Sequence, residues 1–273
     1  MRGLTEFPNG TFLLKVPFET IDTAVWLLQN EDKIFLIDCA TTAFDVEAYI
    51  LPAINELKKS KDTSVTLLLS HAHSDHAGGA SALLSALPHL SVYAADPARY
   101  PFDVSPLRDG DVLGGFLEVL CPAGHSSDIC TFFDRRTDTL YTADTLQWSG
   151  VSRYGTGVTS PMRYIEAHLT LARKNAAHLF ASHSYFPHGG EAHGRAEVRR
   201  MIAASLSIFR TLVADVIATG TADPSAVAAA LTERRQDITP AHPPVPVFTV
   251  RSILKEGAEA LLEKADEALS YLI

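Results

Sequence analysis

The stretch Leu67-Leu68-Leu69-Ser70-His71-Ala72-His73-Ser74-Asp75-His76-Ala77-Gly78-Gly79 decides the fold of this chain. It starts as an apolar run typical of a buried strand and then places three histidines and an aspartate within the six positions 71–76. His71 and His73 are two positions apart, so they leave the end of an extended strand on the same side. Asp75 and His76 follow in the turn that opens the next helix. The four side chains can therefore converge.

These side chains are of the kind that bind a transition metal. Imidazole nitrogens with one carboxylate suit zinc, with iron or manganese as alternatives, better than magnesium or calcium, which prefer oxygen ligands. The competing interpretation is a surface loop that is rich in histidine. The pattern His-x-His-x-Asp-His directly after an apolar strand disfavours that interpretation.

Length and composition indicate an ordinary globular protein. The chain has 273 residues, of which 47% are hydrophobic, and this is enough for one large domain or one domain with an appendage. It carries 23 basic and 32 acidic residues, and the net charge of −9 repels a polyanionic backbone. Nucleic acid is therefore a disfavoured partner.

The cysteines and the N-terminal segment indicate the compartment. Cys39, Cys121 and Cys130 are too few and too scattered for a disulfide framework, so we expect buried, inert thiols in a reducing compartment. Residues 1–10 lack a positive region followed by an apolar core, and no apolar run approaches the length needed to cross a bilayer. The sequence therefore predicts a cytoplasmic protein without a membrane partner.

Apolar runs and helical patterns alternate along most of the chain, which predicts an α/β fold. We expect strands at residues 12–14, 24–28, 33–38, 64–70, 90–95, 115–121, 129–134, 139–142 and 178–182. We expect helices at residues 43–59, 77–87, 161–177, 196–219, 224–235 and 248–272. Pro52 predicts a kink in the first helix, and Asp223 is suited to cap the fifth.

Further metal-binding side chains stand where other apolar strands stop. His125 follows one strand, Asp144 a second and His183 a third. In α/β folds ligands gather at strand ends, so these loops are expected to meet the first motif at one place. The seven residues can then hold two ions about 3.5–4 Å apart.

In this order the motifs resemble those of the metallo-β-lactamase superfamily, over roughly residues 10 to 190. The resemblance implies a four-layer αββα sandwich over residues 1–194, followed by a C-terminal helical extension over residues 195–273. It also implies that the first metal is held by His71, His73 and His125, the second by Asp75, His76 and His183, and that Asp144 bridges both.

Two positions depart from the family pattern. Ala143 precedes the bridging aspartate where the family usually has glycine, and the last motif reads Ser182-His183-Ser184 where the family usually has Gly-His-Gly. His188 is therefore a competing candidate for the last ligand, although His183 directly follows a strand. Asp38 matches a buried aspartate of the family, which would accept a hydrogen bond from a ligand histidine and set its tautomer.

The site and its resemblance predict a hydrolase with two zinc ions and a metal-bridging hydroxide. Asp75 is the expected catalytic residue, because it can orient the hydroxide or pass its proton on. The tail is similar to those of glyoxalase II-like thioesterases and of an RNA-cutting relative, and the acidic charge favours a small thioester or ester substrate. The alternatives are a phosphodiester hydrolase or nuclease and a metal-dependent binding protein without turnover. Pairing of two chains through the tail helices is left open.

Overall fold

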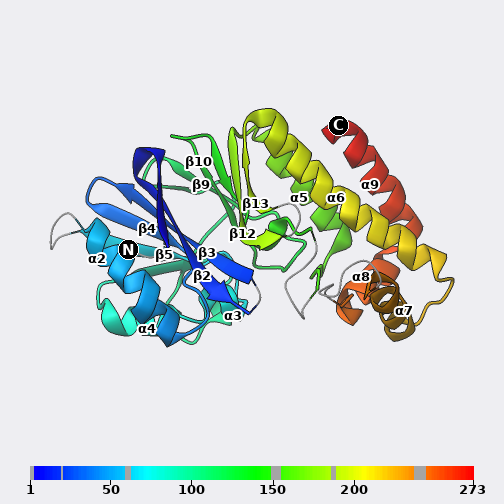
Figure 1. The fold of residues 1–273 in the computed structure, drawn as a ribbon, viewed down its shortest axis with the longest axis horizontal. Coiled ribbons are helices and arrows are strands. Elements are labelled where there is room, and N and C mark those ends of the chain that lie inside the picture. The colour runs from blue at the N-terminus through cyan, green and yellow to red at the C-terminus, as the bar shows by residue number, and fades with distance from the viewer. Residues whose placement is uncertain (1–2, 20, 59–62, 149–154, 186–188, 237–243) are drawn as a thin grey trace. The chain divides into compact units, whose positions relative to one another are not determined.

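A computed structural model of the chain describes all residues except 1–2, 20, 59–62, 149–154, 186–188 and 237–243 (Figure 1). It contains two compact units, each of which is described by itself. The first unit comprises Met1–Cys121 and Cys130–Thr137, and the second comprises Pro122–Ile129 and Asp138–Ile273.

The first unit contains a seven-stranded sheet with the strands in chain order. Its first four strands are antiparallel neighbours, and β4 to β7 are parallel. Asn30 pairs with Lys33 in a hairpin around Glu31, which has a positive φ. The strands are β1 (Leu4–Phe7), β2 (Thr11–Phe18), β3 (Ile21–Asn30), β4 (Lys33–Ile37), β5 (Ser64–Leu68), β6 (Ser91–Ala94) and β7 (Ser105–Pro106).

Parallel pairing of β4 with β5 places the segments that carry Asp38 and the first predicted motif at one edge of this sheet. Ile37 lies opposite Leu68, and the Asp38 N–H donates to the Leu68 carbonyl at 2.9 Å. The residues that follow the two strands therefore leave the sheet side by side. The apolar run that ends β5 is buried completely, as a strand covered on both faces requires.

The helices of the first unit are α1 (Ala43–Asp45), α2 (Leu51–Leu57), α3 (Ser74–Ala77) and α4 (Ala80–Ala86). Val46–Ile50 forms a π-helical turn between α1 and α2, directly before Pro52, which lies in the first turn of α2. Because proline has no N–H and crowds the preceding turn, the irregularity that was predicted here takes this form. The apolar faces of α2 and α4 join the core of the sheet.

The helix predicted at residues 77–87 is α4, which begins only at Ala80, because Gly78 and Gly79 separate it from the short helix α3. A Cβ atom on Gly78 would lie 2.1 Å from the Thr41 carbonyl oxygen, and one on Gly79 would lie 2.2 Å from that of Cys39. Only glycine allows this approach of two backbone segments. The glycines thus hold the metal motif against the loop that follows β4.

The first unit also contains the antiparallel strands β8 (Val112–Leu113), β9 (Leu117–Leu120) and β10 (Thr131–Asp134). Short 3-10 turns occur at Pro8–Gly10 and Pro97–Arg99. Strands β1, β7 and β8 were not expected from the sequence, because each is short.

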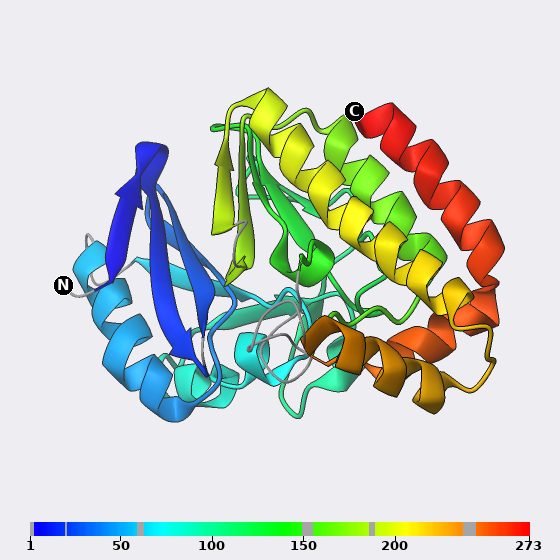
Figure 2. The same cartoon turned by 45° about the vertical axis from the view of Figure 1, so that its right-hand side comes forward.

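The second unit contains three strands and the C-terminal helices. β11 (Thr139–Tyr141) is parallel to β12 (His178–Tyr185), and β13 (Gly189–His193) pairs antiparallel with β12. A 3-10 turn, η4 (Ala143–Thr145), follows β11. The helices are α5 (Pro161–Arg173), α6 (Arg195–Ala218), α7 (Pro224–Gln236), α8 (Val247–Glu256) and α9 (Ala258–Leu272). Helices α5, α6 and α9 pack side by side (Figure 2).

The single helix predicted at residues 248–272 is wrong, because the chain bends between α8 and α9 at Gly257. That residue has a φ of +90°, which glycine adopts without the penalty of a Cβ atom. The predicted cap of α7 is confirmed, since the Ser225 N–H donates to the Asp223 carboxylate at 3.0 Å. The boundary between residues 194 and 195 stays a prediction as a domain limit.

Helix α6 is long and strongly apolar. By length and composition alone it could cross a membrane, which was not expected of any segment from the sequence. Half of its apolar window is buried, and the helix packs against α5, α9 and β13. These are the surroundings of a core helix.

Candidate metal centre

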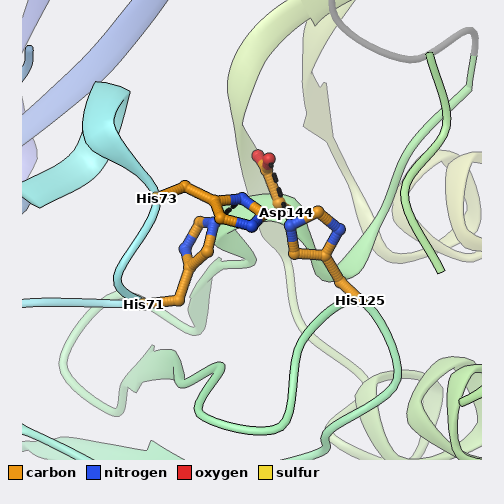
Figure 3. Close-up of side chains that lie close together, drawn as sticks. All are labelled: His71, His73, His125 and Asp144. Atoms are coloured by element: carbon orange, nitrogen blue, oxygen red, sulfur yellow. Dashed lines mark hydrogen bonds and ion pairs between the residues drawn. The ribbon is translucent and has the colours of Figure 1, made fainter. Parts of the chain in front are cut away.

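One group of candidate ligands lies directly after β5 in the first unit. The Nε2 atom of His71 and the Nδ1 atom of His73 are 2.9 Å apart, and Figure 3 shows the two rings converging. Two nitrogens on one tetrahedral zinc ion, each about 2.0–2.1 Å from it, would lie roughly 3.3 Å apart. His71 is buried and His73 is exposed. The two ring nitrogens are thus close enough to face one ion, and their role as ligands stays a prediction.

The short helix α3 carries the other two residues of the first motif. The Nε2 atom of His76 lies 3.4 Å from an Asp75 carboxylate oxygen, and both residues are nine-tenths or more buried. The His73 carbonyl accepts the N–H of His76 at 3.1 Å, so the helix begins directly after the strand-end histidines. A nitrogen and a carboxylate oxygen therefore face each other here.

Asp38 sets the tautomers of two histidines in this unit. Its carboxylate accepts hydrogen bonds from the Ser70 N–H and hydroxyl, both at 2.8 Å, and from His76 Nδ1 at 2.7 Å. Because the Ser70 hydroxyl donates to Asp38, its oxygen is left to accept from His71 Nδ1 at 3.0 Å. Both rings then carry their proton on Nδ1 and present Nε2 to a metal. The predicted contact of Asp38 is confirmed, whereas the part of Ser70 was not foreseen.

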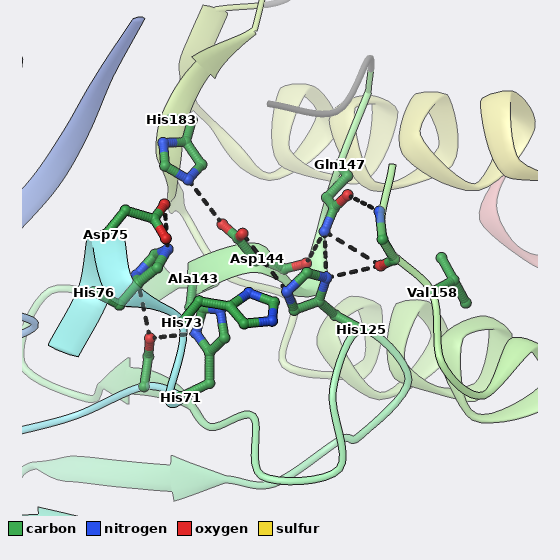
Figure 4. Close-up of polar contacts among 12 residues, drawn as sticks. His71, His73, Asp75, His76, His125, Ala143, Asp144, Gln147, Val158 and His183 are labelled. Carbon is green, nitrogen blue, oxygen red and sulfur yellow. Dashed lines mark hydrogen bonds and ion pairs between the residues drawn. The ribbon is translucent and has the colours of Figure 1, made fainter. Parts of the chain in front are cut away.

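A second group of candidate ligands lies in the second unit. Asp144 directs one carboxylate oxygen toward His125 Nε2, at 3.7 Å, and the other toward His183 Nε2, at 3.3 Å (Figure 4). All three residues are more than nine-tenths buried. A carboxylate whose two oxygens face two different histidines has the geometry that the predicted bridging role requires.

Gln147 joins the two backbone segments that hold these ligands. Its Oε1 accepts the Gly157 N–H at 3.0 Å, and its Nε2 donates to the Asp144 carbonyl at 3.1 Å. The Gly157 carbonyl accepts from His125 Nδ1 at 2.7 Å, which leaves Nε2 of that ring for a metal. Sequence reasoning missed Gln147 and Gly157. The position of Gln147, three residues after Asp144, was the available signal.

Gln147 also connects to a buried polar group between α5 and α6. Its N–H and carbonyl both bond the Ser205 hydroxyl, which in turn contacts His168 Nε2 at 3.0 Å. Burial lowers the pKa of His168 to about 4, and burial raises the pKa of Tyr164, which lies beside it, to about 12. His168 is thus a neutral core residue.

The remaining candidates are resolved differently. His188, the competing last ligand, lies outside the described residues. His178 and His193 pair with each other, with their Nδ1 atoms 3.0 Å apart, at the opposite end of β12 from His183. Tyr185 is buried against Trp148, so its ring is part of the core.

The side chains present fit a transition metal in each unit. In His71, His76 and His125, Nδ1 is hydrogen-bonded to a hydroxyl, a carboxylate and a carbonyl oxygen, respectively. In each ring the other nitrogen, Nε2, faces a neighbouring candidate ligand. Neutral imidazole and carboxylate together are the donor set that zinc, iron and manganese accept.

Three comparisons with known proteins bear on this centre. The family model described as the Metallo-beta-lactamase superfamily matches residues 20–183. The chain is 28% identical over 145 residues to a hydroxyacylglutathione hydrolase of Citrobacter koseri, covering 52% of this chain and 54% of that protein. It is 26% identical over 170 residues to one of Prochlorococcus marinus, covering 60% and 65%. The chain thus spans about half to two thirds of these curated relatives.

Solved structures are similar in fold. A metallo-beta-lactamase family protein of Thermus thermophilus matches 94% of this chain and 93% of its own, with a TM-score of 0.64 and 18% identity. The DIM-1 metallo-beta-lactamase matches 75% of this chain and 96% of its own, with a TM-score of 0.59 and 15% identity. These similarities confirm the predicted αββα fold with a C-terminal helical region.

Proposed function

Since the chain belongs to the metallo-beta-lactamase superfamily, we propose that it is a dinuclear zinc hydrolase that cleaves a small thioester or ester. The proposal rests above all on Asp144, whose two carboxylate oxygens face His125 and His183. A carboxylate that is shared between two ions needs this arrangement. The thioester preference is supported by the curated relatives, which are named hydroxyacylglutathione hydrolases, and by the net charge of −9.

The proposed ligand set is the one expected from the sequence. His71, His73 and His125 would hold one ion, Asp75, His76 and His183 the other, and Asp144 both. Bound zinc would supply the Lewis acidity that ionises water near neutral pH and polarises the substrate carbonyl. Asp38 and Ser70 would keep His76 and His71 in the tautomers that bind metal, and the Gly157 carbonyl would do the same for His125.

Asp75 is the proposed catalytic residue. Its carboxylate is mostly buried beside His76 Nε2, where it can accept a hydrogen bond from the attacking water and take up its proton. Burial strengthens such a bond relative to one in water. The acyl carbon would then be attacked without a protein nucleophile, and the thiol or alcohol would leave with a proton.

The proposal is tested with purified, zinc-loaded protein on acyl-CoA, acyl-glutathione, lactone and phosphodiester substrates. We expect hydrolysis of a thioester or ester, with turnover abolished in His71→Ala and Asp144→Ala. His178→Ala is the matched control, because His178 is a histidine of β12 that pairs with His193 and is not a proposed ligand. Turnover of the phosphodiester alone would make the protein a nuclease-type hydrolase instead.

Metal content provides an independent check. We expect about two zinc ions per chain after reconstitution. A lower content, with no hydrolysis of any substrate after zinc is added, would favour a binding protein without turnover and would refute the proposed enzyme.

A further inference from the structure

Two cysteine side chains meet at the end of a hairpin in the first unit. The Sγ atoms of Cys121 and Cys130 are 3.3 Å apart. Cys121 directly follows β9, and Cys130 directly precedes β10. The last registered pair of these strands is Leu120 with Thr131, so the cysteines occupy the next opposed position. Scattered, inert thiols were expected from the sequence, and the structure contradicts the scattering for this pair.

The backbone hydrogen bonds of the two cysteines indicate which kind of strand position they occupy. The Cys121 N–H donates to Asp109 at 2.9 Å and the Cys130 N–H donates to the Ser70 carbonyl at 2.7 Å, so the cysteines do not exchange backbone hydrogen bonds. Opposed residues in such a non-hydrogen-bonded antiparallel position have Cα atoms about 4.5 Å apart. Disulfides span Cα separations of about 4.4–6.8 Å. A bond would require the sulfurs to approach from 3.3 Å to about 2.05 Å.

Access and reactivity differ between the two thiols. Cys130 is fully buried, whereas Cys121 is partly exposed. The hydrogen bond with Cys130 lowers the pKa of the Cys121 thiol, while burial opposes this effect. Cys39 is different, because burial raises its pKa and its thiol donates to the His76 carbonyl at 3.3 Å. Cys121 is therefore the thiol that a reagent meets first.

We propose that Cys121 and Cys130 are a dithiol modification site, which a low-molecular-weight disulfide converts into an intrachain disulfide. The Cys121 thiolate attacks one sulfur of the reagent, whose S–S bond breaks and releases one thiolate. Cys130 then attacks the Cys121 sulfur of the mixed disulfide and releases the second thiolate. The two cysteine protons pass to the released thiolates, so the protein loses two electrons and the reagent gains them.

The new bond would close a ring around the segment that carries His125. The eight residues from Pro122 to Ile129 lie between the two cysteines, and His125 is in the middle of that segment. Closing a loop removes conformational freedom from it. Formation of the disulfide does not depend on the proposed hydrolase activity. An effect of the disulfide on the metal centre, by contrast, rests on the proposed function.

The experiment treats the folded, metal-loaded protein with excess oxidised glutathione and counts alkylatable thiols by mass spectrometry after unfolding. We expect the count to fall from three to one, with the remaining thiol on Cys39, and to return to three with dithiothreitol. Peptide mapping should find the Cys121–Cys130 link, and amide hydrogen exchange in residues 122–129 should slow in the oxidised protein.

Variants make the outcome decisive. Cys39→Ser is the matched control and should still form the link, whereas Cys121→Ser and Cys130→Ser should not. Retention of all three thiols in the wild type, or glutathione that stays attached to Cys121 without forming the intrachain link, would overturn the proposal. Either result is independent of whether any acyl substrate is hydrolysed.

Discussion

Replacing Asp38 with asparagine tests whether one buried carboxylate sets the tautomers of the first motif. In the wild type it accepts three hydrogen bonds, two from Ser70 and one from His76 Nδ1. An asparagine keeps one acceptor oxygen, which can remain on the Ser70 N–H. Its NH₂ group then faces the Ser70 hydroxyl and His76 Nδ1, and it can only donate to them.

The consequence for metal binding follows from the proton on His76. If Nδ1 must accept, the ring proton moves to Nε2, which is the nitrogen proposed to bind the second metal. A hydrogen bond to a charged group contributes about 1.5–3 kcal/mol, and loss of the group that orients a ligand histidine typically weakens metal affinity by about 10–100-fold. We therefore expect zinc to bind the second site of Asp38→Asn about 10–100-fold more weakly.

Zinc affinity is measured by competition with a chromophoric chelator, and hydrolysis is measured at limiting and at saturating zinc. Asp134→Asn is the matched control, because Asp134 is a fully buried carboxylate of the same unit that is bonded to Arg136 at 2.7 Å. It should lower thermal stability without changing zinc affinity. If Asp38→Asn binds both ions as tightly as the wild type, Asp38 does not set the metal-binding tautomer.

Three further substitutions probe the second unit. Gly157→Ala would place a Cβ atom 3.2 Å from His125 Cε1, so we expect reduced zinc occupancy of the first site; a wild-type zinc titration would contradict this. The pKa of His168 is about 4 in the folded protein, against an ordinary value of 6.5, so between these values the unfolded chain binds the proton and the folded protein does not. Acidification through that range therefore lowers the free energy of unfolding by up to about 1.4 kcal/mol per pH unit. Urea titrations should show a shallower pH dependence in His168→Gln, and equal slopes would argue against a neutral His168. Gly257→Ala should lower the free energy of unfolding by about 1–3 kcal/mol through backbone strain, because among the described residues no atom other than those of its chain neighbours lies within 4 Å of the new Cβ; unchanged stability would mean that the bend tolerates other residues.

The sequence was most informative where a chemical pattern coincided with a strand end. The run before His71 predicted β5, and the apolar segments before Asp144 and His183 predicted β11 and β12. Short or bent elements were less predictable. Strands as short as β8 carry too few residues to show a period, and the bend at Gly257 depends on a single positive φ within a continuous helical pattern.

The hydrogen bonds around the ligands could not be predicted in full for a different reason. Ser70 bonds Asp38, which is 32 positions away in the chain, and His125 bonds the Gly157 carbonyl, also 32 positions away. Such pairs leave no local pattern, because their partners meet only when separate strands and loops pack. Family resemblance pointed to Asp38, whereas no comparable signal existed for Gly157.

The sequence by itself determined which kinds of atom are available for metal binding and in what order the strands present them. That information is local, since residue type and strand periodicity can be read within a few positions of His71. Only the tertiary structure decided which nitrogen of each ring is directed at its neighbours and that Cys121 and Cys130 meet. Tautomers and thiol pairs depend on contacts across the fold, and packing creates those contacts.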